Sequence, residues 1–194
     1  MRTTAAAITT NHVLAAQEMI QAEIAGTMQA IDPGQIAAVA ELAGSAKRIF
    51  VGGAGRSGLV LRMAAMRLMH LGLTVHVAGD ITTPAITEGD LLLVASGSGT
   101  TSGVVRSAQT AADLGARIAA VTTDPGSPLA HLATAIVQVP AARKTDHGSA
   151  KSKQYSGSLF EQSLFLATES LFHCLWSSTD LPAEELWLRH ANLE

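Results

Sequence analysis

The chain has 194 residues, of which 47% are hydrophobic and 15% charged, and its formal net charge is -3. This length predicts one domain with a substantial core, and so small a charged fraction suggests that partner subunits cover part of the surface. The dispersed charge argues against a nucleic-acid footprint, and no uninterrupted apolar run reaches the roughly 18 residues of a membrane span. Because the N-terminus also lacks a signal-peptide core, we expect a cytoplasmic protein that binds neither nucleic acid nor a membrane.

Two helices are expected before any strand. Apolar residues recur at helical spacing from about residue 11 to residue 31. Asp32 followed by Pro33 then predicts the start of a second helix, which ends near Gly44, because aspartate caps helices and proline fits the first helical position.

From residue 48 onward, short apolar runs alternate with helical patterns. Strands are expected at 48–51, 74–77, 91–95, 117–122 and 135–139, and helices at 57–71, 101–114 and 127–132. Continuous apolar strands that alternate with helices are typical of a parallel sheet covered on both faces. We therefore predict an α/β fold, a three-layer α/β/α sandwich built on a five-stranded parallel sheet.

The C-terminal part is expected to be helical. The polar segment 143–158 has no clear period and predicts a loop longer than a plain connection, as functional loops often are. A long helix is expected at 159–176, and Pro182 predicts the start of a last helix that carries His190. The predicted organisation is one domain, with N-terminal helices in 1–46, the sheet core in 47–140 and C-terminal helices in 156–194.

Two of the expected strands end in loops rich in glycine and hydroxyl side chains, each just before a helix. The first loop is GGAGRSG at 52–58 and the second is SGSGTTS at 96–102. Glycines let the backbone turn sharply, and free N–H groups at a helix start favour an anion. Because ligands of open parallel sheets bind outside the carboxyl ends of the strands, we predict that both loops bind one phosphate. The plain alternative is that both are tight turns with capping residues.

The first loop also fits a dinucleotide fingerprint. The pattern G-x-G-x-x-G runs from Gly53 to Gly58, and Asp80 after the next strand is in place to bind a ribose. Two helices before the fingerprint strand, and a hydroxyl-rich second loop without a task in a dinucleotide site, count against this alternative.

With both loops in place, the sequence resembles the sugar isomerase (SIS) domain family. The segments that carry the resemblance are VGGAGRSG at 51–58, RLMHLG at 67–72, SGSGTT at 96–101, SLFEQ at 158–162 and RHANLE at 189–194. Within that family, they are most similar to the isomerases that interconvert 3-hexulose 6-phosphate and fructose 6-phosphate in the ribulose monophosphate pathway, which fixes formaldehyde.

The resemblance implies a flavodoxin-like sheet of five parallel strands, a homotetramer, a phosphosugar substrate and no cofactor. It makes four hydroxyl side chains the phosphosugar ligands: Ser57, Ser96, Ser98 and Thr101. Gly55 and Arg56 of the first loop join them as candidates, and Arg56 can either pair with phosphate or hold the loop through a carboxylate. One departure is Thr100, which stands where loops of this type often carry glutamate, so no catalytic role is assigned to that position.

The isomerisation implied by the resemblance needs a base. Moving a ketone from C3 to C2 removes the C2 proton, passes through an enediol and protonates C3, so one carboxylate can act without a metal or redox cofactor. Glu161 is the candidate base, although a glutamate in a first helical turn also serves simply to complement the helix dipole. His190 is the second candidate, because histidine exchanges protons near neutral pH, and the family precedent suggests that it enters a neighbouring subunit's site.

Two other function classes stay open from the sequence. SIS domains also serve as phosphosugar sensors in regulators, but the basic DNA-binding segment that a regulator would usually carry is missing. Another phosphosugar, such as arabinose 5-phosphate, is an alternative substrate. The histidines lack metal-ligand spacing, so no metal site is expected, and Cys174 is expected to be a small core residue.

Overall fold

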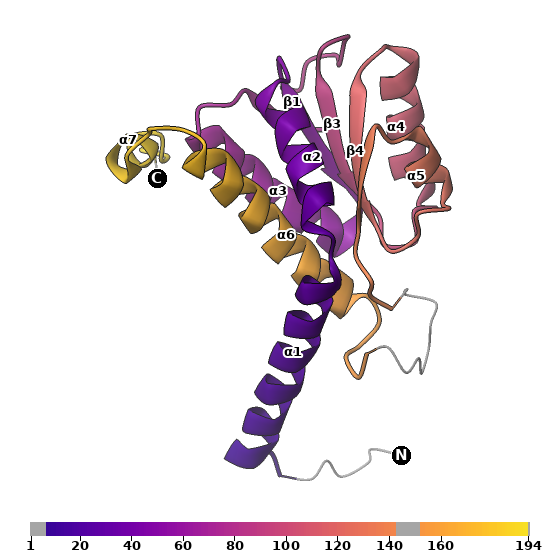
Figure 1. Cartoon of the computed structure of the whole chain (residues 1–194), viewed down its shortest axis with the longest axis vertical. Coiled ribbons are helices and arrows are strands. Elements are labelled where there is room, and N and C mark those ends of the chain that lie inside the picture. Colours follow the sequence, from indigo (N-terminus) through magenta and orange to yellow (C-terminus); the bar gives the residue numbers. More distant parts are fainter. Residues whose placement is uncertain (1–6, 143–151, 194) are drawn as a thin grey trace.

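The computed structural model describes residues 7–142 and 152–193, and its centre is a five-stranded parallel sheet in the order β2-β1-β3-β4-β5 (Figure 1). The strands are β1 (Ile49–Gly53), β2 (Val75–Val77), β3 (Leu91–Ala95), β4 (Arg117–Thr122) and β5 (Ala135–Gln138). Every neighbouring pair is parallel. The predicted α/β class and all five strands are confirmed.

Helices cover both faces of this sheet (Figure 1). They are α1 (Thr10–Ala30), α2 (Pro33–Gly44), α3 (Gly55–His70), α4 (Ser102–Asp113), α5 (Pro128–Leu132), α6 (Ser158–Ser177) and α7 (Ala183–Trp187). Helices α2, α3 and α6 share one buried cluster with the sheet, and α4 and α5 share the other. The three-layer sandwich is therefore confirmed. The predicted loop at 143–158 falls largely on residues 143–151, which lie outside the described residues.

The central strands are apolar without interruption because each of their faces meets a helical layer. In β3, Leu91 and Leu93 pack against the layer of α2, α3 and α6, whereas Leu92 and Val94 pack against α4 and α5. Successive side chains of a strand point to opposite faces, so a strand buried on both faces cannot alternate with polar residues.

Strand β1 and helix α3 meet in a turn that is tighter than the sequence predicts. Gly52 and Gly53 pair with Val94 and Ala95 and so belong to β1, and α3 begins at Gly55 rather than near residue 57. Gly55 has a φ of +57°, a conformation that favours glycine, and a Cβ at Gly58 would collide with the carbonyl oxygen of Gly53. The glycines of the fingerprint pattern thus serve close packing of a helix against a strand.

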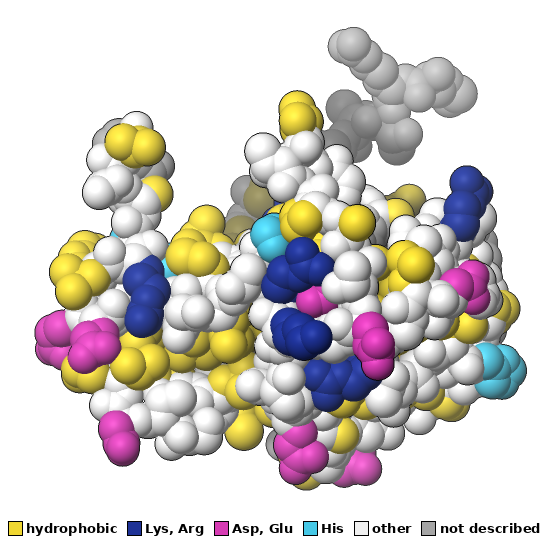
Figure 2. All heavy atoms as spheres, turned by 90° about the horizontal axis from the view of Figure 1, so that it is seen from above, with side chains coloured by type: hydrophobic (Ala, Val, Ile, Leu, Met, Phe, Trp, Pro, Cys, Tyr) yellow, Lys and Arg dark blue, Asp and Glu magenta, His cyan; other side chains and the backbone are white. Residues whose placement is uncertain are grey.

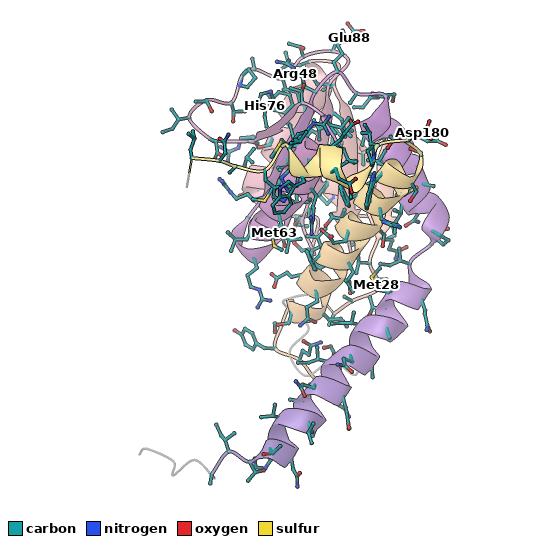
Figure 3. The ribbon with its side chains drawn as sticks, turned by 90° about the vertical axis from the view of Figure 1, so that its left-hand side faces the viewer. Met28, Arg48, Met63, His76, Glu88 and Asp180 are labelled. Atoms are coloured by element: carbon teal, nitrogen blue, oxygen red, sulfur yellow. The ribbon has the colours of Figure 1, made fainter. Side chains whose placement is uncertain are left out.

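Helix α1 extends away from the rest of the molecule (Figures 1 and 3). Thr27 is its buried residue, and Val13 and Leu14 near its start are each 49% exposed. Its Glu23 holds the chain just before α6, accepting hydrogen bonds from Ser152 Oγ (2.7 Å) and the backbone N–H of Lys153 (2.7 Å).

The end of the molecule opposite α1 is formed by the amino ends of the strands, where Arg48 and Glu88 are labelled in Figure 3. Figure 2 looks onto this end and shows Lys and Arg side chains interspersed with Asp and Glu beside a band of hydrophobic side chains. Arg48 binds the fully buried Asp90 there, with Nη2 2.6 Å from Oδ2, which ties the start of β1 to the start of β3.

Two sequence expectations for the C-terminal part are wrong. Helix α7 ends at Trp187, so His190 lies in the turn after it, where its N–H donates to the carbonyl of Trp187 (3.1 Å). Cys174 is exposed, although Leu171 and Phe172 of the preceding turn of α6 are buried. Across the described ranges, no helix combines the length and apolar character that crossing a bilayer would require.

Candidate active site

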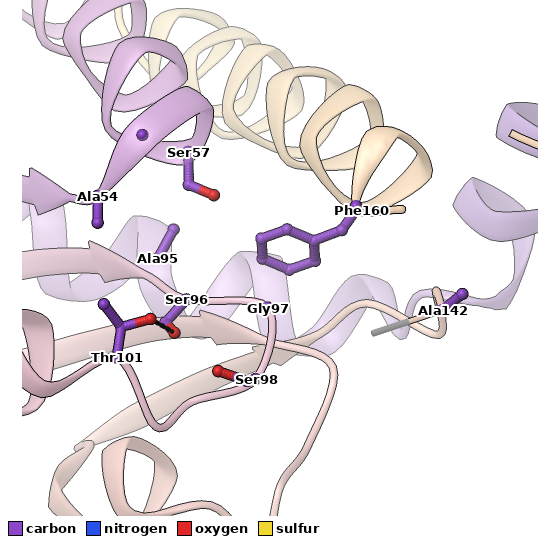
Figure 4. Close-up of a pocket in the computed structure, with 11 residues that line it drawn as sticks. Ala54, Ser57, Ala95, Ser96, Gly97, Ser98, Thr101, Ala142 and Phe160 are labelled. Carbon is purple, nitrogen blue, oxygen red and sulfur yellow. Dashed lines mark hydrogen bonds between the residues drawn. The ribbon is translucent and has the colours of Figure 1, made fainter. Parts of the chain in front are cut away.

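A cavity of about 250 Å³ opens at the carboxyl ends of β1 and β3 (Figure 4). The loops after both strands and the first turn of α6 form its walls. Its lining includes Gly55, Ser57, Ser96, Ser98, Thr101 and Phe160. Both predicted phosphate loops therefore face one space, as the rule for open parallel sheets requires.

The hydroxyl groups of the second loop are held in place by one another. Ser96 Oγ lies 2.9 Å from Thr101 Oγ1, and Thr100 Oγ1 donates to Ser98 Oγ (2.9 Å). Ser57 and Ser96 are each only 4% exposed, so their hydroxyls are shielded from bulk water. Figure 4 shows Ser57 on one side of the cavity and the bonded pair of Ser96 and Thr101 on the other.

Two of the helices that begin at the cavity, α3 and α4, have N-termini without side-chain caps. The N-cap residue of α3 is Ala54, and that of α4 is Thr101, whose hydroxyl is bonded to Ser96 and does not cap its helix. First-turn N–H groups without a cap need another acceptor, and with the helix dipole they favour an anion. Among the described residues, no charged side chain lines the cavity, so an anion bound there would rest on N–H and hydroxyl donors.

Gly99 lets the second loop turn back toward the carboxyl end of β4. Its φ is +63°, and a Cβ on Gly99 would collide with the side chain of Ser127. Thr123 Oγ1 donates to the carbonyl of Gly97 (2.8 Å), and the Leu129 N–H donates to the carbonyl of Gly99 (3.1 Å). Strand β4 and helix α5 therefore fix the loop that carries Ser96, Ser98 and Thr101.

Glu161 lies beside the cavity in the first turn of α6 and is 3% exposed. It does not line the cavity, but its neighbour Phe160 does. Its Oε2 lies 2.7 Å from Nε of Arg56, whose side chain is 60% exposed. Of the two roles that the sequence left open for Arg56, the structure shows the contact with a carboxylate.

His190 lies far from the cavity within one chain. Its ring stacks on His70, the last residue of α3, with centroids 4.1 Å apart, whereas the cavity is at the first residues of α3. Sixteen residues of helix separate the two ends by about 22 Å. Burial, and then the charges of His190, Arg67 and Arg189, lower the pKa of His70.

The structure thus brings together most of the predicted site residues. Gly55, Ser57, Ser96, Ser98 and Thr101 line one cavity, Arg56 and Glu161 form an ion pair at its edge, and His190 is apart from them. Phe160, whose ring forms an apolar wall, was not predicted from the sequence. Its signal there was its place next to Glu161 in the segment SLFEQ.

Among the described residues, the acidic residue of the dinucleotide alternative and the histidine, cysteine and carboxylate side chains that could bind a metal lie outside the cavity lining. Asp80, the ribose-binding residue of the dinucleotide alternative, pairs with Arg62 at 2.6 Å. Within residues 7–142 and 152–193, no three His, Cys, Asp or Glu side chains gather closely enough to hold a metal ion.

Comparison with known proteins agrees with this geometry. The family model of the SIS domain matches residues 44–166. The chain is 67% identical to a 3-hexulose-6-phosphate isomerase of Mycobacterium gastri, over 91% of this chain and 88% of that protein. It is 42% identical to one of Bacillus subtilis, over 77% of this chain and 82% of the relative. A Methanococcus jannaschii crystal structure, described as inferring a 3-hexulose-6-phosphate isomerase function, superposes with a TM-score of 0.78 at 26% identity, covering 92% and 99% of the two chains.

Proposed function

The chain belongs to the SIS domain family, and from that premise we propose that it is a sugar-phosphate isomerase that interconverts 3-hexulose 6-phosphate and fructose 6-phosphate. One observation carries the proposal: two hydroxyl-rich loops line one cavity and a buried carboxylate lies beside it, in a chain 67% identical to an enzyme of that name. Its place would be the ribulose monophosphate pathway in the cytoplasm.

In this proposal the phosphate binds between the two loops. The hydroxyls of Ser57, Ser96, Ser98 and Thr101 and the uncapped N–H groups of α3 and α4 supply its donors. The sugar carbons then extend toward the first turn of α6, where Phe160 forms the wall and Glu161 lies next in sequence.

Glu161 is the proposed base. It takes the proton from C2 of the 3-ketose, and the electron pair of that C–H bond forms the C2=C3 double bond while the C3 carbonyl oxygen takes up a proton to give the enediol. Glu161 then returns its proton to C3, and the carbonyl forms at C2 as the C2 hydroxyl gives up its proton, so that overall one proton passes from C2 to C3 and one from the C2 oxygen to the C3 oxygen. The step conserves atoms and electrons, so the residues of this site can carry it without an added oxidant or reductant.

We further propose that the working unit is a homotetramer whose sites are shared. His190 is about 22 Å from the cavity along α3, so it can reach a cavity only from a neighbouring subunit. The outer face of α3 supports such an assembly, because Leu59, Met63 and Met66 recur there at helical spacing and are all at least half exposed.

The decisive experiment supplies ribulose 5-phosphate, formaldehyde and a 3-hexulose-6-phosphate synthase, and measures fructose 6-phosphate. We expect fructose 6-phosphate to form only when this chain is added. A parallel reaction with arabinose 5-phosphate tests the alternative substrate. Conversion of arabinose 5-phosphate, with no fructose 6-phosphate in the first reaction, would overturn the proposed specificity.

The role of Glu161 has its own test. We predict that Glu161→Gln reduces kcat by at least about a thousandfold and leaves fructose 6-phosphate binding within roughly threefold, because the amide keeps the shape but cannot accept the C2 proton. Glu169→Gln, on the same helix and paired with Arg67 at 3.5 Å, is the matched control and should retain activity. Near-normal turnover in Glu161→Gln would remove Glu161 from the mechanism.

A further inference from the structure

The ion pair between Arg56 and Glu161 joins the two elements that form the cavity. Arg56 is the second residue of α3, between the lining residues Gly55 and Ser57, and Glu161 is in the first turn of α6 next to the lining residue Phe160. The pair therefore joins the carboxylate proposed as base to the loop proposed to hold the phosphate.

The two partners differ sharply in exposure. The Glu161 side chain is 3% exposed, whereas that of Arg56 is 60% exposed. A carboxylate so far removed from water is costly to keep charged without a paired cation. Arg56 supplies that cation at 2.7 Å and reaches it from the solvent side.

The proposed substrate brings a second anion to this place. A phosphate at the start of α3 would lie near the Glu161 carboxylate, and two negative groups in a partly desolvated site repel each other. Arg56 is the charged side chain that the first loop itself carries, so it can offset that repulsion while remaining bonded to Glu161.

We propose that Arg56 is a positioning residue for this reaction: it holds the Glu161 carboxylate in place and offsets its charge, so that a phosphosugar can bind beside it. The inference rests on the proposed function for the identity of the substrate. In this role Arg56 acts through Glu161 and is not itself a ligand of the phosphate, so its effect on binding depends on the charge at position 161.

A double-mutant cycle separates these two roles, with inorganic phosphate and fructose 6-phosphate as calorimetric probes. We expect Arg56→Gln to weaken binding of both probes by roughly tenfold when residue 161 is glutamate, and by less than about twofold in the Glu161→Gln background. An equal loss in both backgrounds would make Arg56 a direct phosphate ligand and overturn the proposal. No loss in either background would overturn it as well.

Turnover and folding controls complete the test. Arg56→Lys keeps the charge and should recover most of the binding lost in Arg56→Gln, but only part of kcat, because an ammonium cannot reproduce the fixed geometry of a guanidinium. Arg62→Gln, on the same helix with its exposed partner Asp80, is the matched control and should bind both probes as the wild type does. A single cooperative unfolding transition above the assay temperature would show that every variant is folded.

The phosphate arm of the cycle needs no turnover. If the coupled assay yields no fructose 6-phosphate but inorganic phosphate binding follows the expected pattern, the proposed function fails while the role of Arg56 stands. If fructose 6-phosphate is formed but Arg56→Gln weakens binding equally in both backgrounds, the proposed function stands and the role of Arg56 fails.

Discussion

At the scale of single residues, the site depends on hydroxyl groups that hold one another. Ser96 is buried, and its Oγ lies 2.9 Å from Thr101 Oγ1, so each orients the other toward the cavity. A hydroxyl fixed in this way can donate to an anion without first losing rotational freedom, which a solvated serine would have to do. The two residues should therefore act as one donor unit.

This arrangement predicts a defect in binding for Ser96→Ala. Losing one hydrogen bond to a charged group and releasing Thr101 should raise KM by roughly ten- to a hundredfold and change kcat by less than about threefold. Steady-state kinetics with fructose 6-phosphate measure both constants. Ser170→Ala removes a helix-surface hydroxyl that donates to the Leu166 carbonyl and should leave both unchanged. An unchanged KM in Ser96→Ala would show that the phosphate lies elsewhere.

Residue types and spacing were enough to predict part of this site. Glycines and hydroxyls after two strands predicted that both loops would face one site, because parallel strands bring their carboxyl ends to the same end of the sheet. The partner of Arg56 could not be predicted, since an arginine can reach any carboxylate that the fold brings near, and Glu161 is far away in sequence. Phe160 was missed because its place next to Glu161 was its only signal, and that place does not show that an apolar residue faces a cavity.

At the scale of elements, the turn between β1 and α3 sets the position of the first loop. A Cβ at Gly58 would collide with the Gly53 carbonyl oxygen. Glycine at position 58 therefore lets α3 approach β1 more closely than a residue with a side chain would. The closeness places Ser57 and the uncapped N-terminus of α3 at the cavity.

We therefore predict that Gly58→Ala both destabilises the protein and impairs the site. The backbone must shift to relieve the collision, which should lower Tm by several degrees and weaken inorganic phosphate binding by about tenfold or more. Gly103→Ala is the matched control, because a Cβ there meets nothing within 4 Å. A methyl group at that helical position should leave Tm unchanged or raise it slightly. Equal behaviour of the two variants would contradict this account of the turn.

The ends of a strand could be predicted where they coincide with the ends of an apolar run. They could not be predicted where the strand continues through glycines. Strand β3 was predicted without error, since a run of apolar residues buried on both faces has clear ends. Strand β1 extends further than predicted, through Gly52 and Gly53, because those glycines pair with β3 although glycine usually signals a turn. The last helix ends earlier than predicted. His190 lies after it, with its ring against His70 and Trp187, and such ring contacts cannot be read from a sequence pattern.

The amino edge of the sheet depends on one buried carboxylate. The Arg48 side chain donates two hydrogen bonds to Asp90, and this holds the pKa of Asp90 below its ordinary value although burial opposes the shift. Backbone and side-chain hydrogen bonds from Thr87 act in the same direction. A carboxyl with a depressed pKa in the folded state stabilises the protein above its unfolded-state pKa of about 4. That stabilisation is lost as the pH falls through the folded-state value.

Asp90→Asn should accordingly show a pH-dependent loss of stability. At pH 7 we expect its Tm to be on the order of 5 °C or more below that of the wild type, because Arg48 loses its ionic partner. As the pH falls below about 4 the difference between the two Tm values should shrink, and it should vanish once the pH is below the folded-state pKa of Asp90. Thermal unfolding across this range measures the difference. Asp80→Asn, which breaks an exposed pair with Arg62, should differ little from the wild type at any pH.

At the scale of the whole molecule, one chain leaves its candidate residues at opposite ends of α3. The cavity is at the first residues of α3 and His190 stacks on its last residue. The face between these ends carries the exposed Leu59, Met63 and Met66. If two copies of α3 pack antiparallel through this face, a two-fold axis brings the end of one α3 beside the start of the other. Such packing would place the partner's copy of His190 near the cavity.

Subunit mixing tests whether the site is shared in this way. Glu161→Gln and His190→Ala should each be nearly inactive alone, since each removes one candidate group from every site. If a site takes Glu161 from one chain and His190 from another, mixed dimeric units contain one intact site, so random exchange should recover up to about a quarter of wild-type activity. If both residues act within one chain, no mixture contains an intact site and none of the activity returns. The same experiment with two samples of Glu161→Gln controls for recovery by exchange alone.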